Sequence, residues 1–436
     1  MKTISAVTVL GANGTMGSRI SGIFASFGDV KVYMVSRDLG RSRQAAASAC
    51  KSVKADSIDA NLVPADYSMI QQCVADSDLV LESVAEDLET KLEVTRLVAP
   101  FLQDDTIVCS GTSGLSITTL SEALPENHRR HYFGAHFFNP PYAMPLCEVV
   151  PTEYTDRRML EEFKFYLGER LIRTVVEVKD SPAFMGNRIG FQFVNQALQY
   201  ADRYKSNGGI DYIDAILGRF TGRSMAPLVT SDFVGLDVHK AIVDNVYNMT
   251  QDYAHDSFVL PTFCANLVSE GKTGKKVNAG LYKREALDSG ARKALVYDID
   301  TGSYREKAQY IFPFAEKMIA DFRIGDYDGA FKELMNNQSV EAETCLSFLL
   351  EYVVYALSVS EAVGDSVRAA DDVMAAGFNW CPPLAMIDAM STVTDFTKLA
   401  KERLSPGIQA EVDLDSVLAR AERSAYDYRQ YFRSAR

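Results

Sequence analysis

The sequence has few of the residues that build disulfide frameworks and zinc sites. Its 7 cysteines are scattered singly over 436 residues, and no Cys-x-x-C motif or Cys/His cluster occurs. The spacing therefore predicts neither a disulfide framework nor a metal site. Free thiols persist in a reducing compartment, so we expect a cytoplasmic protein.

Long apolar runs and basic blocks are also missing. No uninterrupted apolar run approaches the roughly 20 residues of a membrane-spanning helix, and the N-terminus leads so directly into an apolar segment that no signal peptide is expected. The formal net charge of −13 argues against nucleic acid as a partner. With 47% hydrophobic and 24% charged residues, the composition is that of a globular protein. Its length suggests about two to three domains, and neither a membrane nor a nucleic acid is expected as a partner.

A glycine-rich turn near the N-terminus carries a clear signal. The short run of residues 6–10, rich in apolar and β-branched side chains, predicts a buried strand, residues 18–27 predict an amphipathic helix, and residues 30–35 predict a second strand. Between the first strand and the helix stands the turn Gly11-Ala12-Asn13-Gly14-Thr15-Met16-Gly17. This order is typical of dinucleotide binding, in which glycines let the backbone approach a pyrophosphate at the helix N-terminus. The alternative is a glycine-rich turn without a ligand.

The end of the second predicted strand bears on the choice between NAD and NADP. NAD-binding chains usually place an acidic residue there, on the ribose 2′-hydroxyl. Here Ser36 takes that position, and Arg37 and Asp38 follow. A small hydroxyl beside a guanidinium suits a 2′-phosphate, so we favour NADP. An inward-turned Asp38 would instead serve NAD.

One of only 5 histidines lies in an apolar, aromatic segment. His136 belongs to the stretch Gly134-Ala135-His136-Phe137-Phe138-Asn139-Pro140-Pro141, and Glu148 follows on the next predicted strand. A histidine oriented by a carboxylate is the usual apparatus for moving a proton on and off a hydroxyl. The alternative is a buried histidine whose ring bonds a backbone carbonyl.

The pattern along the chain predicts an α/β region followed by helices. Apolar strands at residues 79–84 and 106–110, with a helix at 88–101 between them, predict a doubly wound parallel sheet. Strand signals fade after residue 182, and residues 184–204 predict one long helix. The polar residues 279–309 predict an irregular linker.

The helical part contains a weak internal repeat. Ala226-Pro227-Leu228-Val229-Thr230-Ser231-Asp232 is similar to Pro382-Pro383-Leu384-Ala385-Met386-Ile387-Asp388, which indicates a duplicated helical domain. We therefore divide the chain into a Rossmann-type NAD(P)-binding domain (1–181), a first helical domain (182–285), a linker with connecting helices (286–340) and a second helical repeat (341–436).

Taken in order, these motifs resemble the 3-hydroxyacyl-CoA dehydrogenase family. The resemblance rests on the glycine turn, the His136/Glu148 segment and three further motifs, Glu82-Ser83-Val84-Ala85-Glu86 with Lys91, Thr112-Ser113-Gly114-Leu115, and Asp180-Ser181-Pro182-Ala183-Phe184-Met185-Gly186-Asn187-Arg188. It implies a Rossmann domain followed by helical domains like the C-terminal domain of 6-phosphogluconate dehydrogenase, here doubled and without an attached enoyl-CoA hydratase. It also implies reversible oxidation of a 3-hydroxyacyl-CoA to the 3-oxoacyl-CoA with NAD or NADP, as in fatty acid β-oxidation.

The resemblance also implies roles for single residues. His136 would take the hydroxyl proton and Glu148 would orient it, while Ser113 and Asn187 would hydrogen-bond the reacting oxygen or the thioester carbonyl. Taken alone, Ser113 could instead cap the helix starting near Ser116, and Asn187 could merely pair with solvent.

Two further residues would lie near the nicotinamide and its ribose, namely Glu86 and Lys91. Alternatively, both residues are ordinary charged side chains on a solvated helix surface. The chain departs from the family where Gly111 and Gly114 flank Thr112-Ser113 in place of the usual Asn and Ser. This departure bears on acyl specificity and rate more than on the class of reaction.

The repeats depart as well, with Ala226-Pro227 and Pro382-Pro383 where the family usually has Gly-Pro. Two other functions stay open: a dehydrogenase of a non-CoA hydroxy acid of carnitine or sugar-acid type, and a cofactor-binding homologue without turnover. Family members commonly dimerise through the helical domain, so the chain would be either a homodimer or a monomer whose two repeats mimic that contact.

Overall fold

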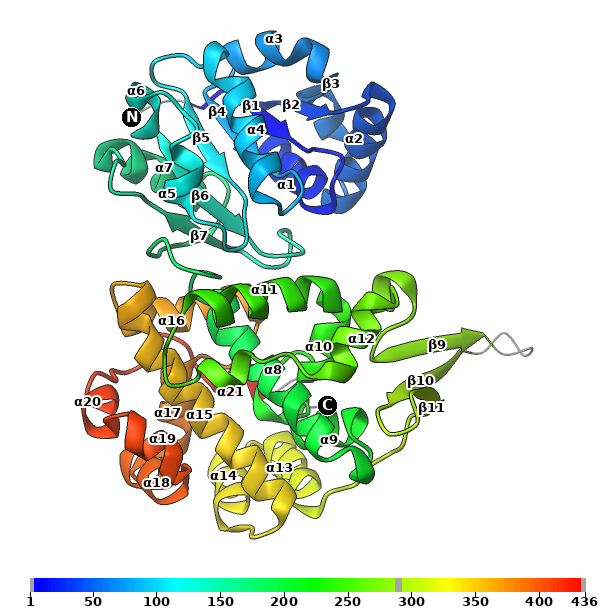
Figure 1. The fold of residues 1–436 in the computed structure, drawn as a ribbon. Helices are drawn as coiled ribbons and strands as arrows, with labels where there is room; N and C mark the ends of the chain where they lie inside the picture. Colours follow the sequence, from blue (N-terminus) through cyan, green and yellow to red (C-terminus); the bar gives the residue numbers. More distant parts are fainter. Residues whose placement is uncertain (1–3, 287–291, 433–436) are drawn as a thin grey trace. The chain divides into compact units, whose positions relative to one another are not determined.

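The computed structural model describes residues 4–286 and 292–432, which fall into two compact units (Figure 1). The first unit runs to Phe184 and also includes Val363–Asp365. The second unit holds Met185–Ala362 and the residues from Ser366 onward.

The first unit is built on an eight-stranded sheet with the order β3-β2-β1-β4-β5-β6-β7-β8. Neighbouring strands are parallel except β6 and β7, which are antiparallel. The strands are β1 (Ala6–Leu10), β2 (Lys31–Ser36), β3 (Leu62–Asp66), β4 (Leu79–Glu82), β5 (Ile107–Ser110), β6 (Tyr132–Phe137), β7 (Leu146–Val150) and β8 (Thr174–Glu177). This arrangement confirms the predicted doubly wound sheet.

The central strands are apolar because helices cover them. Every residue of β1, β4, β5, β6 and β7 is buried, as is usual for parallel strands in the middle of such a sheet. The helices of this unit are α1 (Thr15–Ser26), α2 (Leu39–Val53), α3 (Ile70–Ala75), α4 (Leu88–Val98), α5 (Ile117–Ser121), α6 (Glu126–Arg129) and α7 (Arg157–Glu169).

The carboxyl ends of the parallel strands meet at one edge of the sheet. Strand order reverses between β1, whose crossover leads to β2, and β4 on its other side. In open α/β sheets, ligands bind at this edge, next to the strands where the order reverses. Leu10, Glu82, Ser110 and Phe137 end β1, β4, β5 and β6 there.

The second unit is mostly helical. Its helices are α8 (Gly186–Arg203), α9 (Ile210–Ile216), α10 (Pro227–Val234), α11 (Leu236–Met249), α12 (Thr262–Ser269), α13 (Pro313–Ile324), α14 (Tyr327–Asn336), α15 (Val340–Val363), α16 (Val367–Val373), α17 (Pro383–Ser391), α18 (Phe396–Arg403), α19 (Pro406–Glu411), α20 (Leu414–Leu418) and α21 (Arg429–Phe432). Helix α15 is long and apolar enough to span a membrane, although no uninterrupted run in the sequence suggested one; 78% of its apolar window is buried, as in the core helix of a folded domain.

The two proline motifs of the helical unit have the same hydrogen bonds. Leu228 N at the start of α10 donates to Asp214 Oδ1 at 2.8 Å, and Leu384 N at the start of α17 donates to Asp371 Oδ1 at 2.8 Å. In each case a buried aspartate from an earlier helix satisfies an amide of the first turn, which has no partner within its own helix. This shared hydrogen-bond pattern supports the duplication of the helical domain inferred from the sequence.

The expectation of an irregular linker over residues 279–309 is wrong. Most of this stretch forms an antiparallel sheet of β9 (Tyr282–Ala286), β10 (Arg292–Asp298) and β11 (Ser303–Glu306), in the order β11-β10-β9. Figure 1 shows β9 and β10 projecting from the helical unit. Leu295 and Val296 are buried, whereas much of the remaining strand surface carries charge, which hides the strand signal in the sequence.

Candidate cofactor and catalytic site

The glycine turn leaves no room for side chains at two of its positions. Gly11 has φ +77°, and a Cβ there would lie 2.5 Å from the backbone oxygen of Ser83. A Cβ on Gly17 would lie 2.5 Å from the oxygen of Gly11, so the first glycine permits the turn and the third permits close helix packing. Gly14 is the N-cap of α1 and offers no side-chain cap to its first amides. The turn therefore fits a pyrophosphate at the N-terminus of α1.

The other residues predicted for this turn line an open hollow. Asn13, Gly14 and Thr15 line a space of about 420 Å³, and Met16 is partly buried and packs against the hydrophobic core of this unit. Arg41 of α2 also lines this space. The hollow thus joins the start of α1 to the first turns of α2.

At the end of β2, the Ser36 hydroxyl is engaged within the fold. It is 1% exposed and lies 2.8 Å from both the carbonyl oxygen of Asp38 and the hydroxyl of Ser42. The Asp38 carboxylate accepts a hydrogen bond from Arg41 N at 2.8 Å and caps α2. Arg37 is exposed. Asp38 is exposed as well, but its carboxylate is engaged at the start of α2, so Arg37 is the charged group after the strand that has no ion-pair partner among the described residues.

A buried ion pair lies at the end of β4. Glu82 is 2% exposed and accepts from Lys91 Nζ at 2.8 and 3.0 Å, from Ser110 Oγ at 2.6 Å and from Val84 N at 2.6 Å. Lys91 Nζ also lies 3.2 Å from Glu86 Oε2. Lys91 is 1% exposed, so its alternative as a solvated surface charge is wrong.

Glu86 connects this ion pair to the segment after β5. Its Oε1 accepts from the Thr112 hydroxyl at 2.5 Å and from Ser113 N at 2.7 Å. Four residues that the sequence marked, Glu86, Lys91, Thr112 and Ser113, therefore lie together at the edge of the sheet. The capping alternative for Ser113 is wrong, because Ser116 is the N-cap of α5.

Glu82 is the residue of this cluster to which sequence reasoning gave no role. It ends the apolar strand Leu79-Val80-Leu81-Glu82, and a carboxylate within such a strand must be paired when it is buried. This requirement, together with a lysine on the following helix, could have indicated from the sequence that Glu82 forms a buried ion pair.

His136 and Glu148 form a buried pair. They are direct partners in the antiparallel register of β6 and β7, and His136 Nδ1 lies 2.7 Å from Glu148 Oε2. The side chain of His136 is 6% exposed and that of Glu148 is fully buried. The rings of Phe138 and Phe184 flank the imidazole, with centroids at 4.6 and 5.7 Å. Within the described residues, Nε2 of His136 has no hydrogen-bond partner, so this nitrogen is the one available to a ligand.

Asn187 belongs to the second unit. It lies in the first turn of α8 and is 7% exposed, so it is not a solvated surface residue. Its contribution to substrate binding stays a prediction.

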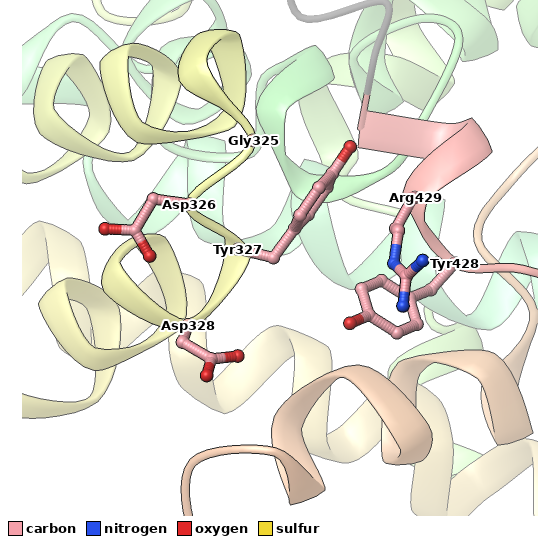
Figure 2. Close-up of a pocket in the computed structure, with 6 residues that line it drawn as sticks. All are labelled: Gly325, Asp326, Tyr327, Asp328, Tyr428 and Arg429. Carbon is pink, nitrogen blue, oxygen red and sulfur yellow. The ribbon is translucent and has the colours of Figure 1, made fainter.

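A second hollow, of about 460 Å³, lies within the helical unit. Figure 2 shows Tyr327, the first residue of α14, beside Tyr428 and Arg429 of the C-terminal segment. Asp326 caps α14 through Gly329 N, and Asp328 accepts from Thr392. Both carboxylates are thus hydrogen-bonded within the fold. This indicates that the hollow is a packing contact between α14 and the C-terminal segment rather than a reaction site.

The fold and the buried pair together define a class, the nucleotide-dependent oxidoreductases built on a Rossmann domain. The family model described as "3-hydroxyacyl-CoA dehydrogenase, NAD binding domain" matches residues 6–181, and the model described as "3-hydroxyacyl-CoA dehydrogenase, C-terminal domain" matches residues 184–284. The chain belongs to the 3-hydroxyacyl-CoA dehydrogenase family. Its NAD-binding domain indicates a nicotinamide cofactor.

Individual relatives agree with this assignment. The chain is 31% identical over 291 residues to mitochondrial hydroxyacyl-coenzyme A dehydrogenase from Sus scrofa, covering 64% of this chain and 90% of that protein. It is 28% identical over 343 residues to a Bacillus subtilis protein named "Probable 3-hydroxyacyl-CoA dehydrogenase", covering 78% of this chain and 42% of that protein. A Deinococcus radiodurans relative of the same name is covered over 60% of its length. The chain thus spans about two to three fifths of the Bacillus subtilis and Deinococcus radiodurans relatives, and nine tenths of the Sus scrofa protein.

Among solved structures, 3-hydroxybutyryl-CoA dehydrogenase from Escherichia coli K12 is similar in fold. The match has a TM-score of 0.66 and 20% identity, and it covers 94% of this chain and 98% of that chain. At this identity the match supports the fold alone. It extends the likeness across both units, beyond the residues that the family models match.

Proposed function

We propose that this chain interconverts a 3-hydroxyacyl-CoA and the corresponding 3-oxoacyl-CoA. The observation that carries the proposal is the buried contact between His136 Nδ1 and Glu148 Oε2, 2.7 Å apart, at the carboxyl edge of the sheet. A proton-transfer group is thereby held at the edge where the glycine turn also lies. Membership of the dehydrogenase family supports the reaction class.

In the oxidation, His136 accepts the hydroxyl proton of the substrate. The Nδ1–H group donates to Glu148, which fixes the tautomer whose Nε2 carries a free lone pair. Nε2 takes the proton as the C3–O bond becomes a carbonyl, and Glu148 stabilises the imidazolium that forms. Glu148 is thus a positioning residue. In the reverse direction the imidazolium returns the proton to the oxygen.

The remaining groups hold the reactants. A nicotinamide dinucleotide held on the glycine turn from Gly11 to Gly17 would supply the hydride acceptor for C3 in the oxidation and the hydride donor in the reduction. Ser113 is proposed to hydrogen-bond the reacting oxygen, where negative charge develops. Glu86 and Lys91 are proposed to shape the wall beside the nicotinamide ribose.

We favour NADP over NAD for this chain. The acid that commonly binds the 2′-hydroxyl of NAD is replaced by Ser36, the Asp38 carboxylate caps α2, and Arg37 is exposed. A guanidinium suits a 2′-phosphate, with which it forms two parallel hydrogen bonds.

A matrix of cofactors and substrates tests the proposal. NADH and NADPH are each assayed with acetoacetyl-CoA, a longer 3-oxoacyl-CoA, free acetoacetate and 3-dehydrocarnitine. We expect turnover with the thioesters and a higher kcat/KM with NADPH. Reduction of the free acids alone would favour the dehydrogenase of a non-CoA hydroxy acid, and no turnover of any substrate would favour a binding protein.

We also propose that the two helical repeats replace the contact through which separate subunits would dimerise. The matched hydrogen bonds at Leu228 and Leu384 support this pairing within one chain. Sedimentation of the purified chain should then give a monomer of about 48.2 kDa. A concentration-independent dimer would contradict this part of the proposal.

A further inference from the structure

The hollow beside the glycine turn has a charge that the overall composition does not suggest. The chain carries a formal net charge of −13, yet the lining of this hollow includes two arginines, Arg19 and Arg41, and no carboxylate. Arg19 donates to Asn139, another residue of the first unit. Arg41 is exposed and, in the parts of the chain that the structure describes, pairs with no carboxylate. The hollow therefore suits an anion.

The position of Arg41 is set by the end of β2. Arg41 is the third residue of α2, and its backbone N donates to Asp38 at 2.8 Å. A dinucleotide held on a glycine turn has its adenosine ribose at the end of the second strand. Arg41 lies on the first turn of the helix that follows this strand end, which makes its guanidinium a candidate partner for a phosphate on the 2′-oxygen of that ribose.

One arginine does not match the charge of such a phosphate. A phosphate monoester carries a charge of about −1.5 to −2 near neutral pH, with three acceptor oxygens. Arg37, immediately after β2, supplies one guanidinium, and within the described residues it has no ion-pair partner. A second guanidinium four residues later would complete the match.

We infer that Arg41 is a second specificity-determining residue that binds the 2′-phosphate of NADP(H) together with Arg37. The inference rests on the proposed function for its cofactor class and adds the residue that distinguishes the two nicotinamide dinucleotides. In this inference Asp38 is a positioning residue: as the N-cap of α2 it fixes the start of the helix, and with it the position of Arg41. The glycine-turn residues that line the hollow would serve either dinucleotide, so the preference for NADP is assigned to Arg37 and Arg41 alone.

Binding of two adenosine nucleotides tests the inference without turnover. Calorimetry on the full chain compares adenosine 2′,5′-bisphosphate with adenosine 5′-monophosphate. We expect wild type to bind the bisphosphate at least tenfold more tightly. Arg41→Ala should reduce this preference about tenfold while leaving the affinity for the monophosphate within twofold. Equal affinities for the two nucleotides in the wild type would overturn the inference.

Arg43→Ala is the matched control. Arg43 is exposed on the same helix, but it lies two residues from Arg41 and therefore points about 200° away around the helix, and it does not line the hollow. We expect its preference to equal that of the wild type. If Arg43→Ala and Arg41→Ala weaken bisphosphate binding equally, the loss follows from the removal of any positive charge on α2, and the assignment of Arg41 as a direct phosphate ligand is wrong.

The two proposals fail in different ways. Turnover of acetoacetyl-CoA with no preference for the bisphosphate would remove the role of Arg41 and keep the dehydrogenase. A preference that depends on Arg41, without turnover of any 3-oxoacyl-CoA, would keep the phosphate site and remove the proposed reaction.

Discussion

His136 and Glu148 are opposite each other in the β6–β7 pair, and the imidazole Nδ1 lies 2.7 Å from the carboxylate Oε2. Directly paired residues of antiparallel strands point to the same face, and a shift of register by one residue would place them on opposite faces. The sheet therefore orients the imidazole without help from a mobile loop. Burial of Glu148 strengthens the contact, because no water competes for the carboxylate.

Gly17 should be intolerant of even the smallest side chain. In Gly17→Ala the new Cβ would lie 2.5 Å from the oxygen of Gly11, so α1 must move away from the turn. We expect a loss of about 1–3 kcal/mol in the free energy of unfolding and at least a tenfold weaker binding of the nicotinamide dinucleotide by titration. Gly168→Ala is the control, since nothing lies within 4 Å of its Cβ position. Equal effects of the two substitutions would contradict the role of the turn.

Glu82 should be needed for the stability of the first unit. Glu82→Gln leaves the Lys91 ammonium, 1% exposed, without its main counter-ion. Breaking one side of a buried ion pair commonly costs about 3–5 kcal/mol, so chemical denaturation should show a loss of that order. The exposed Glu89 on α4 gives the comparison, and Glu89→Gln should stay within about 0.5 kcal/mol of wild type. A loss in Glu82→Gln no larger than in Glu89→Gln would show that the pair is dispensable.

Asp371 should make the helical unit less stable as the pH rises. Burial raises the pKa of Asp371 from 3.8 to about 7, against the opposing hydrogen bonds from Ser424 and Leu384. The folded state thus holds a proton that the unfolded chain releases near pH 4. Its stabilising contribution is complete below that pH and is lost as the pH rises toward 7.

Asp371→Asn removes this titration while an amide can keep both hydrogen bonds. Relative to wild type, it should gain at least about 1 kcal/mol more in the free energy of unfolding at pH 8 than at pH 5. Glu343→Gln, at an exposed position of α15, should give no such difference. A pH-independent effect of Asp371→Asn would rule out this origin of the pH dependence.

The α/β architecture was predictable because its signals are local. The β-branched run of β1, the glycine turn and the apolar face of α1 stand next to one another in the sequence. The sequence analysis placed His136 and Glu148 on neighbouring strands, and the register then brings them into contact. Their chemical roles stay predictions, since geometry alone does not measure proton transfer.

Other features depend on partners that the sequence does not reveal. Glu82 is held by hydrogen bonds from Lys91 and from Ser110, which is 28 residues away in the sequence. Neither partner can be identified from the periodicity of the sequence. The sheet of β9, β10 and β11 escaped prediction because few of its residues are apolar and buried. The engagement of the Ser36 hydroxyl with Ser42 likewise depends on how α2 packs.

The most direct test of the account is the turnover number of His136→Gln with acetoacetyl-CoA and the preferred nicotinamide dinucleotide. His255→Gln serves as the control, because His255 lies in the second unit and its Nδ1 contacts the Thr250 carbonyl at 2.9 Å. We predict that kcat of His136→Gln falls at least about a hundredfold, the usual contribution of a general acid–base group. Dinucleotide affinity should stay within twofold, and the control should behave as wild type. A kcat within threefold of wild type in His136→Gln would contradict the central claim.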